Sequence, residues 1–213
     1  MADAYKTIYQ ESRDEFVVSR SRFIGRAKPI VAEEDALSFI ETIRKSDWDA
    51  SHHVWAYISG AARERYSDDG EPQGTAGLPI LDVIRKEGLR DTVVIVTRYF
   101  GGIKLGTGGL VRAYTQSAKL ALEAGRVIQK LPFLSFGICI PYALAGKFQR
   151  EFQNRGYYIQ NLAYTDQVTL TVLIPPEDKD SLHALVAELT SGSGTLVANP
   201  EEYLSFWQGK RIE

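Results

Sequence analysis

Five glycines crowd into residues 101–109, inside the segment VTRYFGGIKLGTGGLVRAY that spans residues 96–114. The segment joins a continuous apolar run to an amphipathic one, so it must carry the chain from a buried strand into a helix. Because glycine has no Cβ atom, it permits tight turns and a close approach of two backbones. It also permits several backbone N–H groups to converge on an anion where the helix begins. Close packing and anion binding are both open explanations for these glycines.

The established nucleotide-binding motifs do not fit this segment. A Walker A loop requires a lysine directly after its second glycine, and Thr107 occupies that place after Gly106. The dinucleotide fingerprint requires a third glycine where Val111 stands. The glycines therefore predict an anion contact of another kind, or packing alone.

Charge is unevenly distributed along the chain, although the net charge is only −2. Residues 85–130 carry 9 basic and 3 acidic side chains, whereas residues 31–84 carry 4 basic and 11 acidic ones. The basic block can attract an anion or nucleic acid, or it can face the acidic block across the fold. Arg98 has the same two alternatives, a phosphate or an acid within residues 60–72. The candidate phosphate-binding or nucleic-acid-binding residues are Arg98, Gly101, Gly102, Lys104, Gly106, Thr107, Gly108, Gly109, Arg112 and Lys119.

A second candidate is a polar site made of His52, Asp68, Asp69 and Glu71. Imidazole and carboxylate groups suit a metal, but the spacing matches no calcium loop, and the adjacent His53 would point to the opposite face of a strand. No nucleophile elbow is present either. We therefore expect no metal, no cofactor and no catalytic residue.

Periodicity predicts an α+β protein with two domains and a boundary near residues 130–132. The second domain has the order β-α-β-β-α-β, the split ferredoxin-like arrangement, ending in a strand at 195–199. In the first domain, the pattern predicts strands at 7–18 and 22–30 around a turn near 19–21, a helix at 33–46, a strand at 52–59, a loop at 60–74, a helix capped by Thr75, a strand at 92–100 and a helix to about Glu123 closed by Gly125.

Four segments together resemble the IMPACT/YigZ family: SRFIGRA (21–27), ASHHVWAY (50–57), SDDGEPQGTAGLPIL (67–81) and the glycine-rich stretch. The resemblance implies a domain at 1–130 like the second domain of ribosomal protein S5. It also implies a ferredoxin-like domain at 131–205, similar to domain V of elongation factor G, and a short tail at 206–213. Eukaryotic members are translation regulators that act through an additional N-terminal protein-binding domain. Their partner is not expected here, because this chain begins almost directly with the shared region.

These observations predict a non-catalytic binding or regulatory protein linked to translation. We expect it to contact RNA or the ribosome through the basic glycine-rich surface. A protein partner is also possible. No apolar run approaches the roughly 18 residues of a membrane span, so we expect a cytoplasmic protein with no membrane contact. The alternative is an enzyme that holds a phosphorylated small molecule or nucleotide in the glycine-rich loop. Asp68, Asp69 or Glu71 would then serve as base or metal ligand.

Overall fold

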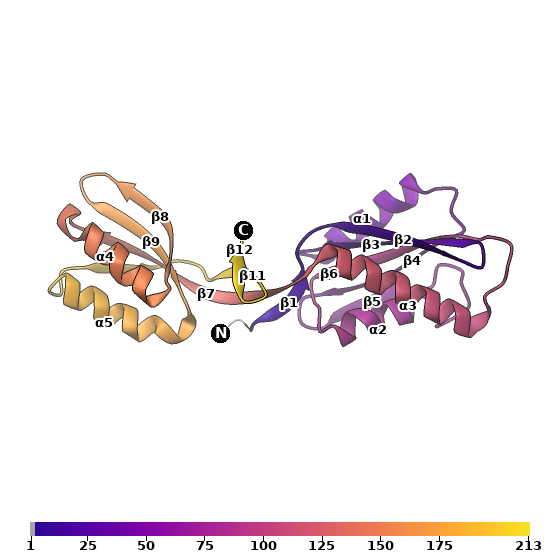
Figure 1. Ribbon diagram of the computed structural model, residues 1–213. Helices are drawn as coiled ribbons and strands as arrows, with labels where there is room; N and C mark the ends of the chain where they lie inside the picture. Colours follow the sequence, from indigo (N-terminus) through magenta and orange to yellow (C-terminus); the bar gives the residue numbers. More distant parts are fainter. Residues whose placement is uncertain (1–2) are drawn as a thin grey trace. The chain divides into compact units, whose positions relative to one another are not determined.

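A computed structural model describes residues 3–213 of the chain. The chain forms two compact units, each with its own hydrophobic core (Figure 1). The N-terminal unit contains residues 5–129 and 207–210, and the C-terminal unit contains residues 130–206 and 211–213 together with 3–4. The fold is mixed α and β, as the sequence predicts.

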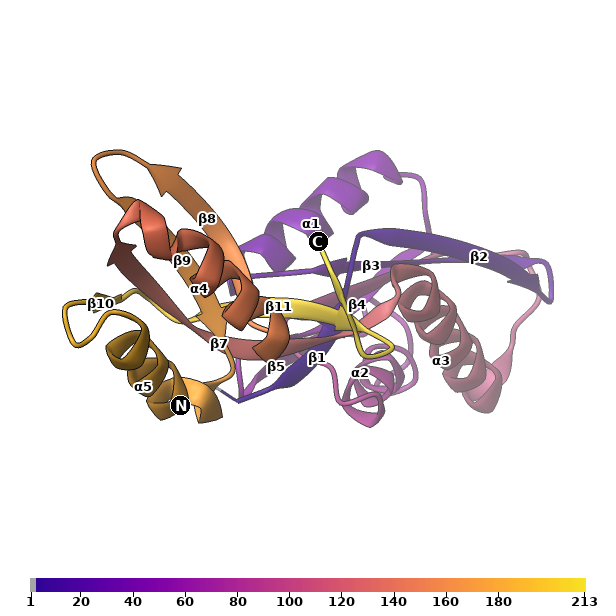
Figure 2. The ribbon, with the colours of Figure 1, turned by 60° about the vertical axis from the view of Figure 1, so that its left-hand side comes forward.

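The N-terminal unit is built on a 5-stranded antiparallel sheet with the order β2-β3-β6-β4-β5. Helix α1 covers one face of this sheet, and α2 and α3 cover the other (Figures 1 and 2). The elements are β1 (Tyr5–Ile8), β2 (Ser12–Val18), β3 (Ser21–Pro29), α1 (Glu33–Ser46), β4 (His52–Ser59), β5 (Arg63–Ser67), α2 (Gly77–Lys86), β6 (Thr92–Tyr99) and α3 (Gly106–Gly125).

Strand β6 explains the three-layer arrangement. Val93 and Ile95 belong to the core under α1, whereas Val94 and Val96 belong to the core under α2 and α3. Because successive side chains on a strand point to opposite faces, a continuous apolar run needs cover on both sides. The predicted strand, buried on both faces, is confirmed.

Residues 60–74 are not a single loop, as the pattern had indicated, because residues 63–67 form β5. This edge strand pairs antiparallel with β4, from Ser59 opposite Arg63 to Trp55 opposite Ser67. Its sequence, RERYS, has no apolar face and is mostly exposed. The backbone of β4 supplies its hydrogen bonds, and charged side chains are usual on an exposed edge. The prediction from hydrophobic periodicity was therefore wrong at this strand.

The cap of α2 comes from Asp68 and not from Thr75. Asp68 Oδ1 accepts hydrogen bonds from the N–H groups of Ala76 (3.1 Å) and Gly77 (2.8 Å). Thr75 Oγ1 instead donates to the carbonyl of Pro72 at 2.7 Å. A carboxylate fits the free amides and partial positive charge of a helix start. Asp68 lies too far back in sequence for local capping rules to identify it.

Asp35 holds the start of α1 and should make its stability depend on pH. Its Oδ2 atom accepts hydrogen bonds at 2.9 Å from the N–H groups of Val31 and Ala32, which lower the pKa of Asp35. A lowered carboxyl pKa stabilises the fold above the unfolded-state value, and the gain is lost as the pH falls through the folded-state value. We expect Asp35→Ala to destabilise the protein at pH 7 and to approach the parent below about pH 4. Urea unfolding across pH, with Glu34→Ala as the neighbouring control, tests this; a difference that is constant with pH would contradict it.

The C-terminal unit follows the predicted order β-α-β-β-α-β. Its sheet places β9 between β7 and β8, with β10 antiparallel to β7, and α4 and α5 share the core against it (Figure 2). The elements are β7 (Val127–Ile140), α4 (Tyr142–Arg155), β8 (Tyr158–Tyr164), β9 (Val168–Ile174), a 3₁₀ turn (Pro176–Asp178), α5 (Lys179–Leu189) and β10 (Thr195–Ala198).

Two features of the C-terminal half were not predicted. The chain passes from one unit to the other at residues 129–130, and this change of unit falls inside the continuous strand β7. Two further strands, β11 (Glu202–Trp207) and β12 (Lys210–Ile212), follow β10, and they include most of the expected tail at 206–213. Both strands are short and mostly half-exposed, and the pairing of β11 with β7 supplies hydrogen bonds that local sequence does not indicate.

Candidate functional site

The glycine-rich segment meets two different steric demands. At Gly101, a Cβ atom would lie 2.0 Å from the backbone carbon and oxygen of Arg20, so only glycine fits against the turn between β2 and β3. The N–H of Gly101 also donates to Ser21 Oγ at 3.2 Å. Gly102 and Gly106 have φ angles of +83° and +69°, which other residues rarely adopt. Packing and backbone conformation therefore account for these three glycines.

Gly108 has neither requirement. It is exposed, and a Cβ atom there would meet only Arg112 Nη1, at 3.7 Å. It lies in the first turn of α3, and the N-cap residue Leu105, which precedes the helix, makes no side-chain capping bond. The first N–H groups of a helix have no partner inside the helix. Steric reasons thus leave Gly108 unexplained, and the backbone there stays open to an approaching group.

Arg98 is buried, so it is not part of an exposed basic surface. Its side chain is 6% exposed, and Nη1 donates to Glu71 Oε1 at 2.6 Å. Nη2 contacts Ser21 Oγ at 3.3 Å, while Nε is buried with no hydrogen-bond partner in residues 3–213. Of the two alternatives for Arg98, pairing with an acid of the 60–72 segment is the one observed.

Glu71 is the centre of this buried network. Its side chain is 4% exposed, and its Oε1 also accepts a bond from the Tyr114 hydroxyl at 2.7 Å. Burial and the adjacent Glu71 charge raise the pKa of Tyr114 well above its usual range, so the phenol remains a donor. Tyr114 lies on α3, Arg98 on β6 and Glu71 between β5 and α2. The network therefore holds three separate elements together.

His52 lies beside this network, whereas Asp68 and Asp69 are engaged elsewhere. His52 Nδ1 contacts the carbonyl of Asp69 at 2.8 Å; a carbonyl only accepts, so Nδ1 carries a proton. Nε2 lies 3.9 Å from Glu71 Oε1. Asp69 Oδ2 instead accepts from the N–H of His53 at 2.6 Å, and Asp68 caps α2. The predicted polar site is thus divided, and only His52 and Glu71 face a common space.

That space is a pocket of about 440 Å³, which we call the Arg98 pocket. Its floor contains the buried Arg98–Glu71 pair and His52, and its walls are largely apolar, with Phe100 48% exposed. Pockets of about 300–1,000 Å³ that combine apolar walls with a few polar groups are typical of ligand sites. The sequence did not predict the apolar site residues Phe100, Leu105 and Leu110, because apolar residues usually indicate a hydrophobic core. The residues that line it are His52, Glu71, Pro72, Arg98, Phe100, Lys104, Leu105, Gly106, Thr107 and Leu110.

The basic block divides into paired and unpaired cations. Arg85 pairs with Glu64 and Arg98 with Glu71, so part of the basic block does face the acidic block. Lys104, Arg112 and Lys119 are exposed and make no ion pair within residues 3–213. Lys104 and Arg112 line a second surface pocket of about 390 Å³, with Lys104 shared between it and the Arg98 pocket.

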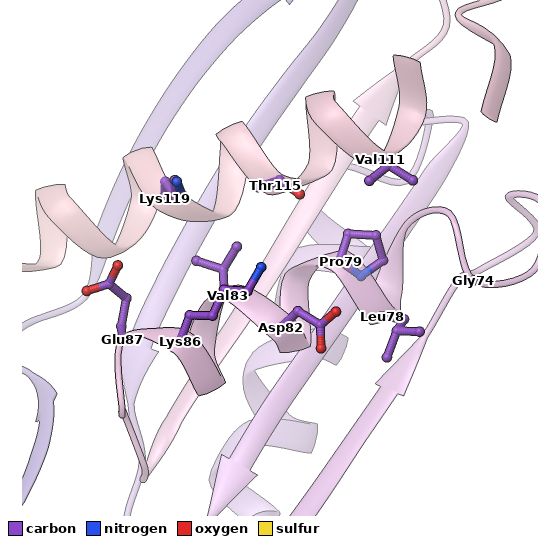
Figure 3. A pocket seen from close by; sticks show the side chains of 10 residues that line it. All are labelled: Gly74, Leu78, Pro79, Asp82, Val83, Lys86, Glu87, Val111, Thr115 and Lys119. Atoms are coloured by element: carbon purple, nitrogen blue, oxygen red, sulfur yellow. The ribbon is translucent and has the colours of Figure 1, made fainter. Parts of the chain in front are cut away.

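A third pocket, of about 360 Å³, lies between α2 and α3. Figure 3 shows Val111, Thr115 and Lys119 on α3 opposite the side chains of α2. The lining contains both Lys86 and Asp82, so it has no single charge preference. Lys119 lies at this pocket and not at the Arg98 pocket, which separates it from Lys104.

Two further properties concern metals and membranes. Within residues 3–213, no three His, Cys, Asp or Glu side chains gather in a way that would hold a metal ion. Over the same residues, no helix has both the length and the apolar character that crossing a bilayer requires.

Both halves of the chain match known protein families. Residues 19–122 match the Impact N-terminal domain, and residues 138–193 match a domain of unknown function, DUF1949. The chain is similar to a solved structure described as a hypothetical protein, with a TM-score of 0.61 and 30% identity, covering 94% of this chain and 99% of that one.

Two relatives are similar along most of their length. The IMPACT family member YvyE of Bacillus subtilis is 34% identical over 206 residues, which is 96% of this chain and 95% of the relative. The IMPACT family member YigZ of Escherichia coli is 35% identical over 189 residues, covering 86% and 92%. The resemblance carried by the four sequence segments is confirmed, and the chain belongs to the IMPACT family.

Proposed function

We propose that this protein binds RNA, free or within the ribosome, as a non-catalytic regulator linked to translation in the cytoplasm. One observation carries the proposal: two exposed cations, Lys104 and Arg112, line the same pocket and make no ion pair within residues 3–213. Cations of this kind contact phosphates and give affinity without reading sequence.

The start of α3 adds to the same surface. The amides of Gly106, Thr107 and Gly108 begin the helix, and Gly108 leaves its backbone sterically open. A helix start carries partial positive charge and favours phosphate. Arg98 is left out of this surface, because its guanidinium is buried against Glu71.

The enzyme alternative has less support. Asp68 and Asp69, which would act as base or metal ligand, accept hydrogen bonds from backbone amides instead. Glu71 pairs with Arg98 and Tyr114. A binding function therefore agrees better with the contacts of these carboxylates.

The proposal predicts that Lys104→Ala/Arg112→Ala weakens RNA binding and lowers its salt dependence. Each lost phosphate contact on single-stranded RNA should reduce the slope of log K against log salt by about 0.7. Fluorescence anisotropy with a mixed single-stranded RNA, and co-sedimentation with ribosomes, both across a salt series, measure the effect.

The matched control is Lys147→Ala/Arg150→Ala, which removes two exposed cations from α4 in the other unit. It should leave RNA binding close to that of the parent. Equal affinity and slope for the parent and Lys104→Ala/Arg112→Ala would reject this surface.

A further inference from the structure

We propose that the Arg98 pocket receives one unstacked base of the bound RNA, with Phe100 as the stacking surface. This inference rests on the proposed function and adds a base site to the phosphate surface. It concerns a pocket whose residues come from β4, the β5–α2 loop, the end of β6 and the start of α3.

Phe100 is the aromatic group of the pocket. It is 48% exposed even though it follows a strand that is almost fully buried. Arg98 Cζ lies 5.3 Å from the centre of its ring, which places the ring beside the polar floor. Leu105 and Leu110 complete an apolar wall next to it. Proteins that bind single-stranded nucleic acid commonly stack bases on exposed aromatic rings of this kind.

The lining of the pocket offers both kinds of hydrogen-bonding group that a base edge needs. The Asp69 carbonyl engages His52 Nδ1, which leaves the Nε2 atom of His52 for another partner. Glu71 accepts its two bonds on Oε1, so its Oε2 is not engaged by them. Arg98 Nε has no hydrogen-bond partner in the described residues but is fully buried, so the donors that line the pocket are the Lys104 ammonium and the Thr107 hydroxyl.

The rim connects this pocket to the proposed phosphate surface. Lys104 and Leu105 line both the Arg98 pocket and the neighbouring pocket that contains Arg112. A nucleotide with its base in the first pocket would thus have cations available for its phosphates. Apolar walls for the base beside cations for the phosphate match the chemistry of a nucleotide.

The test compares two oligonucleotides of equal length, a mixed single-stranded RNA and an abasic one that keeps the phosphates but lacks the bases. We expect Phe100→Leu to weaken binding of the RNA by about tenfold and to leave the abasic oligonucleotide unchanged. Phe100→Tyr, which keeps an aromatic ring, should bind like the parent. Trp48→Leu, at an aromatic that is 81% exposed and outside the pocket, is the control.

The outcomes separate this inference from the proposed function. Equal affinity for the two oligonucleotides, with no effect of Phe100→Leu, would overturn the base site and leave the phosphate surface in place. No binding of either one at low salt would overturn both. Free nucleoside monophosphates form the last arm: if they bind as tightly as the RNA, the ligand is a free nucleotide, and RNA as the source of the base is overturned.

Discussion

Removing either charge of the Arg98–Glu71 pair is expected to destabilise the N-terminal unit by about 3–5 kcal/mol. The side chains are 6% and 4% exposed, so Glu71→Gln leaves a buried guanidinium without its carboxylate, and Arg98→Met leaves the reverse. The double variant Arg98→Met/Glu71→Gln should lose less than the sum of the single variants, because neither charge remains uncompensated.

Urea unfolding followed by tryptophan fluorescence measures this effect selectively. Trp48, Trp55 and Trp207 are the only tryptophans of the chain, and all belong to the N-terminal unit. Arg85→Met is the control, since its partner Glu64 is 32% exposed and such pairs contribute about 0–1 kcal/mol. If Arg98→Met were no more harmful than Arg85→Met, the buried network would not hold these elements together.

Gly101→Ala is expected to destabilise the protein by about 1–3 kcal/mol or more, because its Cβ would lie 2.0 Å from the backbone of Arg20. The backbone carbon and oxygen of Arg20 cannot move away by a side-chain rotation. The turn between β2 and β3 or the start of the glycine-rich segment must therefore shift. Gly108→Ala is the matched control in the same segment. It has ordinary space around the added atom, and alanine is favoured over glycine within a helix by about 0.5–1 kcal/mol.

Thermal and urea unfolding of both variants give the comparison. Opposite signs for the two substitutions would show that the segment contains glycines of two kinds. Equal effects would contradict the packing explanation for Gly101. RNA binding by Gly108→Ala then reports whether the open backbone at that position matters for the proposed phosphate contact.

Several elements follow from the sequence alone, because their cause is local. The apolar period of residues 33–46 matches α1, and Leu110, Tyr114 and Ala118, which share one face of α3 at helical spacing, are buried. Gly156 ends α4 in the left-handed conformation that glycine adopts without strain. These features depend on residues within a few positions of one another, so a single segment contains the information.

The strand β5 and the cap of α2 do not follow from local patterns. β5 is held by the backbone of β4, and the cap is supplied by a carboxylate from the preceding loop. Hydrophobic periodicity detects elements that bury an apolar face, and neither of these features does so. Their stability comes from a neighbour that the pattern does not include.

The sequence by itself determined the family, the two-domain α+β class and the main elements. Only the tertiary structure decided which of the alternatives for each side chain is realised. Arg98 meets Glu71 across 27 residues and Ser21 across 77, and Tyr114 meets Glu71 across 43. Arg98 is therefore buried and not part of the basic surface, whereas Lys104 and Arg112 are exposed on it. The physical reason is that a charge is placed by burial and by partners from distant elements, which come together only when the sheet and helices pack.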